Sequence, residues 1–283
     1  MNSIRRSVVS SRGMPHEPEA SALSQGLGSC ALVSSSDVLL DGRSRAEEID
    51  SYDEVVRVNL APTVNFESRV GRRTSLAVTN APSWLTPAHK LSHNTSVDAW
   101  AAHLDRLRAP PLDVIITDPM CVDDSFKCLR RAPTFWGLYH RQAYCQKMLS
   151  HAHGRCARLA RAWPNAIRSC VRLPDADLKT AWRHVVREAS SSSSPPSPSS
   201  GPREASTGFG CSVFAPSTGL LAAVHLRRRC ASLRLFGFAG RPSRRGHYWK
   251  PDMNLRNEVN LTIEHALVQR WRSLRPASSL SAA

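Results

Sequence analysis

No run of apolar residues in this sequence reaches the roughly 20 residues that a membrane-spanning helix needs. Residues 1–28 also lack the apolar core of a signal peptide. Aromatic residues make up 6% of the 283 residues and do not alternate with basic ones, which argues against a stacking platform for single-stranded nucleic acid. We therefore expect neither a transmembrane anchor nor a signal peptide in this chain.

Metal-binding spacings are missing too. The eight cysteines form no Cys-x-x-Cys pair and no Cys/His pattern typical of zinc, so no metal site is expected. An even number of cysteines suits an oxidising compartment, although eight cysteines can pair in about 105 ways. Two sequons, at Asn94 and Asn260, are compatible with a secretory route.

Acidic residues are scarce relative to basic ones. The chain has 38 Lys and Arg against 23 Asp and Glu, a formal net charge of +15 and a pI near 10.3. This balance suits a partner with negative charge, whether nucleic acid, an anionic membrane surface or a nucleotide sugar. A basic nucleic-acid-binding protein is the least favoured of the functions we consider, and it predicts salt-sensitive affinity for DNA or RNA.

Buried-strand patterns alternate with helical ones. Residues 30–33 are an apolar run that stops at three serines (34–36), and residues 54–60, 74–80 and 112–117 are further strand candidates. This alternation predicts a single-domain, Rossmann-like α/β/α sandwich with a mostly parallel sheet. Because ligands bind at the carboxyl ends of the strands in such sheets, the serine turn is a candidate site.

The domain is expected to span residues 30–276, after a flexible, stem-like lead-in over 1–29 and before a tail over 277–283. A Ser/Pro-rich stretch, 190–206, cannot bury a core and is interpreted as a disordered insertion. Helical patterns cover residues 97–108, 134–163 and 175–189, and Gly154 is expected to divide the second of them.

A second hydroxyl-rich turn follows the insertion. Ser217 and Thr218 precede a helix that runs to about residue 229, and residues 232–238 are expected to form a strand. Free N–H groups at a helix start attract phosphate, but such hydroxyls also serve as ordinary helix caps. From the residues alone, both interpretations stand.

These segments resemble the motifs of the eukaryotic sialyltransferases (glycosyltransferase family 29), most closely the subfamily that makes α2,8 linkages. Two motifs carry most of the resemblance, and two shorter ones follow near the end of the chain. The matching residues are Cys30-Ala31-Leu32-Val33, Ser36, Glu48-Ile49-Asp50-Ser51, Asp53, Arg57, Asn59-Leu60 and Ala61-Pro62 in the large motif, Pro216-Ser217-Thr218-Gly219, Cys230 and Phe236-Gly237-Phe238 in the small motif, Gly246-His247-Tyr248-Trp249 in the third, and Glu264 in the last.

The resemblance implies the sialyltransferase variant of the GT-A fold and an inverting transfer of sialic acid from CMP-sialic acid to a glycan hydroxyl on a glycoprotein or glycolipid. It also implies a Golgi location, no cofactor, no essential metal and no nucleic-acid partner. The residues that it implies are Ser35, Asn59, Ser217, Thr218 and Gly219 for donor binding, His247 and Glu264 for catalysis, and Cys30 and Cys230 for a disulfide.

Two positions depart from the family pattern. Ser35 stands where the family has an asparagine that touches the donor. Val259 stands five residues before Glu264, where the family has the histidine that removes the acceptor's proton. His265 points about 100 degrees away from Glu264 on a helix, so it is not expected to take the place of the family's base histidine. Either His247 or a shifted loop supplies the base, or the chain is an inactive relative that binds CMP or a glycan.

Overall fold

The structure is a computed structural model, and it describes residues 26–80, 111–118, 142–191, 216–238, 247–249 and 258–273. Most of the expected lead-in and insertion, the expected helix over 97–108 and the tail lie outside the described residues. None of the helices within the described ranges is long and apolar enough to cross a membrane.

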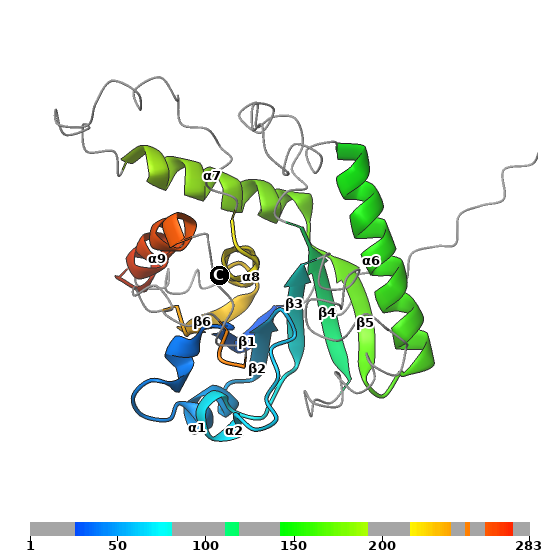
Figure 1. Cartoon of the computed structure of the whole chain (residues 1–283), viewed down its shortest axis with the longest axis horizontal. Coiled ribbons are helices and arrows are strands. Elements are labelled where there is room, and N and C mark those ends of the chain that lie inside the picture. Colours follow the sequence, from blue (N-terminus) through cyan, green and yellow to red (C-terminus); the bar gives the residue numbers. More distant parts are fainter. Residues whose placement is uncertain are drawn as a thin grey trace, which may run out of the picture.

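Within the described ranges, six strands form one parallel sheet in the order β5-β4-β3-β2-β1-β6 (Figure 1). The middle strands are buried on both faces, which explains why their sequences are apolar runs and do not alternate. The expected α/β fold is therefore confirmed. The strands are β1 (Leu27–Val33), β2 (Glu54–Val58), β3 (Leu76–Asn80), β4 (Leu112–Thr117), β5 (Ile167–Arg172) and β6 (Cys230–Phe236).

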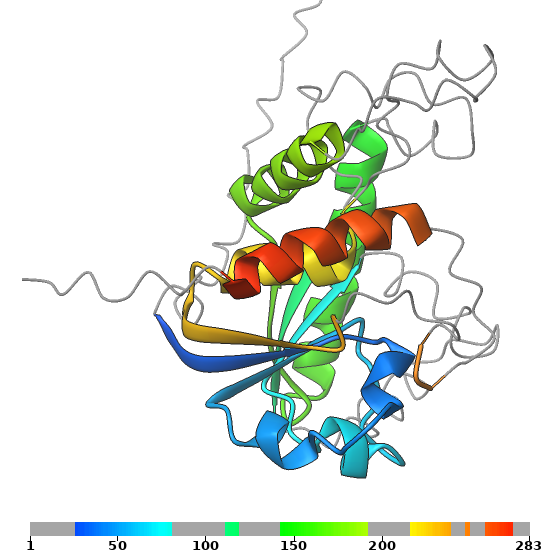
Figure 2. The same cartoon turned by 90° about the vertical axis from the view of Figure 1, so that its left-hand side faces the viewer.

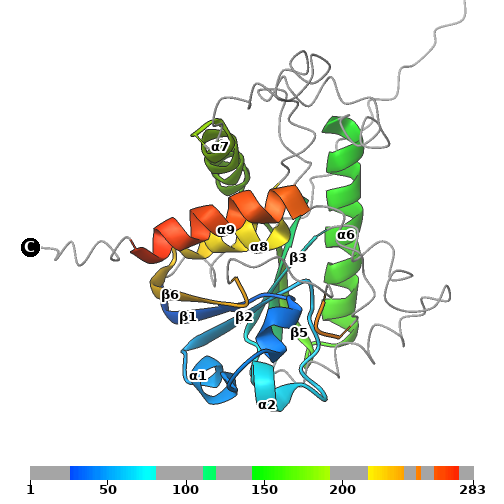
Figure 3. The same cartoon turned by 60° about the vertical axis from the view of Figure 1, so that its left-hand side comes forward.

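Helices cover both faces of the sheet. On one face lie α1 (Ala46–Asp50), α2 (Glu67–Val70) and α6 (Gln142–Ala162), and the 3-10 helix η1 (Asp37–Leu40) follows β1. The other face carries α7 (Asp175–Ser191), α8 (Thr218–Leu226) and α9 (Glu258–Ser273). Figure 3 shows α8 and α9 side by side, with α7 above them. All nine residues of α8 are buried, so this short apolar helix is central to its layer.

The order in which strands are added to the parallel sheet reverses at β1. Strands β1 to β5 follow one another outward, and the chain then returns through α7 and α8 to place β6 on the far side of β1. Right-handed crossovers put the connections before and after this return on opposite faces. The point where the order reverses is where open α/β sheets bind ligands, at the carboxyl ends of β1 and β6.

Two details differ from the expectations. Helix α6 runs unbroken through Gly154, although a helical glycine costs about 1 kcal/mol relative to alanine. Buried Ala152 and Leu159 and the disulfide from Cys156 to Cys170 fix this helix against β5, which outweighs that cost. Strand β5, which contains Cys170, was not predicted, because an edge strand with arginine and serine side chains gives no apolar run.

Candidate active site

The serine turn after β1 is bonded to the end of β6. The Ser34 N–H donates to the Phe236 carbonyl (2.9 Å), and its hydroxyl donates to the Gly237 carbonyl (3.0 Å). Gly237 has a φ of +78°, and a Cβ on it would lie 2.2 Å from Ser34 Oγ. Only glycine fits this position, and the close approach fixes the two strand ends against each other.

The third motif docks on the same turn. The Tyr248 N–H donates to the Ser35 carbonyl (3.1 Å), and His247 forms an isolated backbone bridge with Ser36. The buried Tyr248 hydroxyl donates to the Pro62 carbonyl (2.6 Å), and burial raises the pKa of this phenol. The His247 ring stacks on Trp249 with ring centres 4.6 Å apart. Figure 2 shows this orange segment beside the blue stretch that follows β1, so the predicted residues Ser35 and His247 lie together.

The second hydroxyl turn is held by a carboxylate from α9. The N–H and the hydroxyl of Ser217 donate to the two carboxylate oxygens of Glu264, and each of these hydrogen bonds is 2.5 Å long. The same hydroxyl accepts a bond from the Leu220 N–H (3.1 Å) and so caps α8. Glu264 was expected to be catalytic, and the structure shows that it contacts Ser217. The polar groups of Ser217 are thereby engaged within the protein.

Burial raises the pKa of Glu264 from its ordinary value of 4.5 to about 7, although the bonds from Ser217 oppose this change. The side chain is only 5% exposed, and desolvation disfavours its charged form. At neutral pH, protonated and ionised Glu264 are therefore present in similar amounts. A carboxylate beside the helix start competes with any anionic ligand for the positive end of the α8 dipole.

The start of α8 retains the features of an anion site. The N–H groups of Thr218 and Gly219 belong to the first turn, where no intrahelical acceptor exists. A Cβ on Gly219 would lie 3.1 Å from the Phe238 ring, so α8 packs closely on a residue just beyond the end of β6. This contact places the helix start at the same edge of the sheet as the serine turn.

Asn59 follows β2, the strand beside β1. It has a φ of +57°, and its N–H donates to the Val78 carbonyl (2.8 Å). Because β1 and β2 are parallel neighbours, Asn59 and Ser35 lie beyond the same ends of adjacent strands. The structure thus brings the predicted donor residues to one edge.

Arg57, another residue of the large motif, serves the fold. Its fully buried guanidinium donates to the carbonyls of Val70 (2.9 Å) and Arg73 (2.9 Å) and to the Thr74 hydroxyl (2.9 Å). Burial lowers its pKa. These bonds fix the loop between α2 and β3 against the sheet, a role that the sequence pattern does not reveal.

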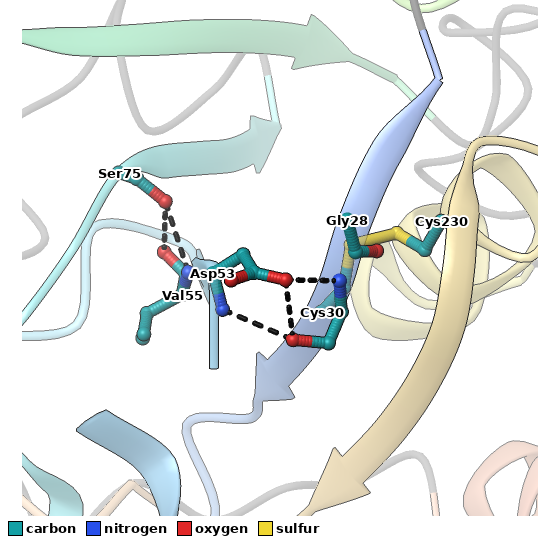
Figure 4. The surroundings of a disulfide bond; sticks show 7 residues. Gly28, Cys30, Asp53, Val55, Ser75 and Cys230 are labelled. Atoms are coloured by element: carbon teal, nitrogen blue, oxygen red, sulfur yellow. Dashed lines mark hydrogen bonds between the residues drawn. A yellow bond between two sulfur atoms is a disulfide. The ribbon is translucent and has the colours of Figure 1, made fainter. Parts of the chain in front are cut away.

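A disulfide joins Cys30 to Cys230 (Cα–Cα 5.9 Å), as the resemblance implied, and links β1 to β6 (Figure 4). Beside it, Asp53 accepts bonds from the N–H (2.7 Å) and hydroxyl (2.8 Å) of Ser29, and these bonds lower the pKa of Asp53. Cys30 and Asp53 both belong to the large motif. Together these links attach β1 to both of its neighbours.

The last motif contributes the start of α9. Val259 lies in the first turn of this helix, five residues before Glu264. His265 follows Glu264 and is half-buried. Within the described ranges, no three His, Cys, Asp or Glu side chains are grouped so that they could hold a metal ion.

Comparisons with known proteins give a coherent result. The family model for glycosyltransferase family 29 (sialyltransferase) matches residues 2–142. Beta-galactoside alpha-2,6-sialyltransferase 2 from Homo sapiens is 40% identical over 78 residues, which is 28% of this chain and 15% of that protein. The same enzyme from Gallus gallus is 38% identical over 76 residues, 27% of this chain and 14% of that protein. The matches thus span only about a seventh of these relatives.

A further human relative, alpha-N-acetyl-neuraminyl-2,3-beta-galactosyl-1,3-N-acetyl-galactosaminide alpha-2,6-sialyltransferase, is 40% identical over 87 residues, 28% of each chain. These three proteins are named as α2,6 enzymes, so they do not support the expected closeness to the α2,8 subfamily. A crystal structure of a mammalian sialyltransferase aligns over 91% of this chain and 70% of its own, with 16% identity and a TM-score of 0.44. From the motifs and the family match, the chain belongs to glycosyltransferase family 29, the sialyltransferases.

Proposed function

We propose that this chain is a glycosyltransferase that moves sialic acid from CMP-sialic acid to a glycan hydroxyl with inversion, and releases CMP. The observation that carries the proposal is the meeting of the serine turn and the start of α8 at one edge of the sheet. Contacts of Ser34 with Gly237 and of Gly219 with Phe238 hold the two turns together. Acceptors would be glycans on glycoproteins or glycolipids, and the site of action would be the Golgi lumen.

In this proposal the phosphate of the donor lies at the start of α8. The N–H groups of Thr218 and Gly219 would donate to it, and His247 would contact it from the serine turn. Ser35 and Asn59 would contact the rest of the donor. This arrangement stabilises the phosphate with the start of α8 and with a hydrogen bond from the N–H of a neutral imidazole, so it needs no metal ion.

Glu264 acts in this proposal through Ser217. By accepting two bonds from Ser217, it fixes the orientation of the first turn of α8. It is therefore a positioning residue, and replacing it should weaken CMP binding more than it alters the chemical step. Glutamine can keep one bond from the Ser217 N–H, so it should preserve more CMP affinity than leucine does.

The base that removes the acceptor proton is the open part of the mechanism. Val259 has no group that can accept a proton, so we assign this task to His247, which lies beside the serine turn. The alternative of an inactive relative depends on Val259 alone, and the names of the related proteins do not favour it.

The test is an assay of CMP release with CMP-sialic acid and an array of galactose-ended and sialylated glycans. The variants are His247→Gln and Val259→His, with His151→Gln as control because His151 is an exposed histidine on α6. Transfer by the native chain that His247→Gln abolishes and His151→Gln preserves supports the proposal. Transfer only by Val259→His supports the inactive relative, and no CMP binding by any variant overturns the assignment.

A further inference from the structure

Four arginines surround a half-buried histidine at the end of α8 that lies away from the serine turn. Arg183 and Arg187 project from α7, one helical turn apart, and Arg227 and Arg228 follow the last turn of α8. All four are exposed. Burial lowers the pKa of His184, and the charges of the four nearby arginines lower it further. We call these four residues the arginine cluster.

Few carboxylates compensate this charge. Arg228 pairs with Asp177 at 2.9 Å. Among the described residues, Arg183, Arg187 and Arg227 have no carboxylate partner within ion-pair distance. Arg227 instead lies over the ring of Trp271, 5.2 Å from its centre. The cluster therefore carries an excess of positive charge.

The helices explain only part of this pattern. Cations after the last turn of α8 interact favourably with the negative end of its dipole, which accounts for Arg227 and Arg228. Arg183 and Arg187 lie in the middle of α7, where no such effect exists, and like charges at this spacing destabilise a helix. Together with Arg227 and Arg228 on the neighbouring helix α8, they concentrate four cations on one part of the surface, which favours an anionic partner.

The surroundings favour a soluble polyanion over a membrane. In the described parts of α7, α8 and α9, the exposed apolar side chains are alanines (Ala176 and Ala266), whereas surfaces that enter lipid present Trp, Phe or Leu. Trp271 is covered by Arg227 and by the edge of His184, whose ring centre is 5.4 Å away. Among the described side chains of these three helices, none that is bulky, apolar and exposed is therefore offered to a lipid interior.

The cellular compartment that the disulfides indicate favours one kind of polyanion over another. The disulfides Cys30–Cys230 and Cys156–Cys170 indicate an oxidising environment, where sulfated glycans are common polyanions and nucleic acids are not. Guanidinium groups bind sulfate through paired, charge-assisted hydrogen bonds. On an α-helix, arginines four residues apart are separated by about 6 Å along the axis, so they can contact successive groups of an extended chain.

We propose that the arginine cluster binds a sulfated polysaccharide. The cluster lies at the end of α8 opposite to Ser217, so an occupied cluster leaves the edge with the serine turn open. The inference does not depend on the proposed transferase activity. It predicts affinity for sulfate-bearing chains that CMP does not displace.

The experiment compares retention of the full chain on a heparin column with that of a triple variant, Arg183→Gln, Arg187→Gln and Arg227→Gln. A second triple variant, Arg43→Gln, Arg158→Gln and Arg161→Gln, is the control, since these three arginines are also exposed and have no carboxylate partner among the described residues. Both variants lose three charges. We expect the cluster variant to bind heparin at least tenfold more weakly at physiological salt and the control less than threefold more weakly.

Competition identifies the partner. The proposal is supported if soluble heparin displaces the chain from the heparin column far better than N-desulfated heparin or a DNA duplex of equal charge does. Equal loss in the two triple variants, equal competition by DNA, or stronger binding of the cluster to phosphatidylserine vesicles than to heparin would overturn it. Circular dichroism of both variants checks that they are folded.

Discussion

The two disulfides given by the described residues hold two very different parts of this molecule. Cys30–Cys230 joins residues 200 positions apart and lies where the strand order reverses. Cys156–Cys170 spans 14 positions and joins α6 to β5, the elements that follow one another at the far edge. The first region holds the serine turn, His247 and the start of α8. The second region packs a helix on an edge strand.

The difference shows how the site is assembled. The edge with β5 and α6 is built from residues close in sequence, so its disulfide closes only a short loop. The candidate site joins β1 to α8, β6 and residues 247–249, which follow in the sequence only after the other four strands. Links between residues far apart in the sequence are therefore concentrated at the candidate site. Variants that disrupt these links should affect the site more than comparable variants affect the edge with β5 and α6.

Removing the two disulfides should give the largest and most unequal effects. In the chain-entropy model, closing a loop of 200 residues stabilises the fold by about 5 kcal/mol, and closing one of 14 residues by about 3 kcal/mol. We expect Cys30→Ala with Cys230→Ala to lower the free energy of unfolding more than Cys156→Ala with Cys170→Ala. Urea unfolding of both double variants measures this difference, and equal losses would mean that loop length does not govern them.

Titration of Glu264 comes next. Its pKa is raised from 4.5 to about 7 in the folded chain, so the native state holds a proton that the unfolded state has lost between these pH values. The contribution of this residue is most favourable below pH 4.5, and it decreases by about 3 kcal/mol as the pH rises to 7. Glu264→Gln should flatten this part of the pH profile of stability, measured by urea unfolding. If Glu264→Gln leaves the slope of stability against pH unchanged, the raised pKa of Glu264 is contradicted.

The same titration should affect the proposed donor. Ionised Glu264 repels a phosphate at the start of α8, so CMP should bind more weakly as the pH rises above 7. Glu264→Gln should remove this part of the dependence. Calorimetry of CMP binding between pH 6 and 8 provides the measurement, with His151→Gln as the reference for general pH effects.

Alanine at Gly237 should have an intermediate effect. A positive φ costs an alanine about 1 to 2 kcal/mol, and the clash of its Cβ with Ser34 Oγ adds about 1 to 3 kcal/mol. Gly42 is the matched control, because it has a φ of +69° and nothing within 4 Å of its Cβ position. Gly237→Ala should therefore destabilise the fold more than Gly42→Ala and also weaken CMP binding. Equal effects would show that the contact with Ser34 is unimportant.

Removing the Tyr248 hydroxyl should have the smallest effect. Tyr248→Phe loses the bond to the Pro62 carbonyl and keeps the contact with the Phe66 ring, whose centre is 5.0 Å away. A single hydrogen bond of this kind contributes about 1 kcal/mol. Thermal unfolding gives the change in stability. A loss above about 3 kcal/mol would mean that the third motif is attached mainly through this hydroxyl.

Much of the fold was predictable because its strands are buried. Residues 112–117 were predicted as a strand with the bounds that β4 has, and residues 30–33 and 54–60 were placed on β1 and β2. Strand β5 was missed because its exposed side chains remove the apolar signal. The predicted division of the helix at Gly154 was wrong, since packing of α6 against β5 outweighs the low helix propensity of one glycine.

The candidate site was predictable in part. The motifs predicted Ser35, Asn59, Ser217 and His247 as site residues, and they implied the disulfide that joins β1 to β6. They did not reveal that Glu264 binds Ser217, because this contact joins residues 47 positions apart on two helices that are brought together by packing. The role of Arg57 was hidden for the same reason, since its partners are carbonyl groups of a folded loop.

The sequence by itself determined the parallel α/β class, the family and the identity of the turn residues, because hydrophobic runs and motif spacings are local properties of a chain. Only the tertiary structure decided that β6 lies on the far side of β1, where the order of the strands reverses. It also decided that His247 docks on the serine turn and that Glu264 is buried against α8 with a raised pKa. Those outcomes depend on which surfaces pack together and exclude water, and such contacts join residues that no local pattern connects.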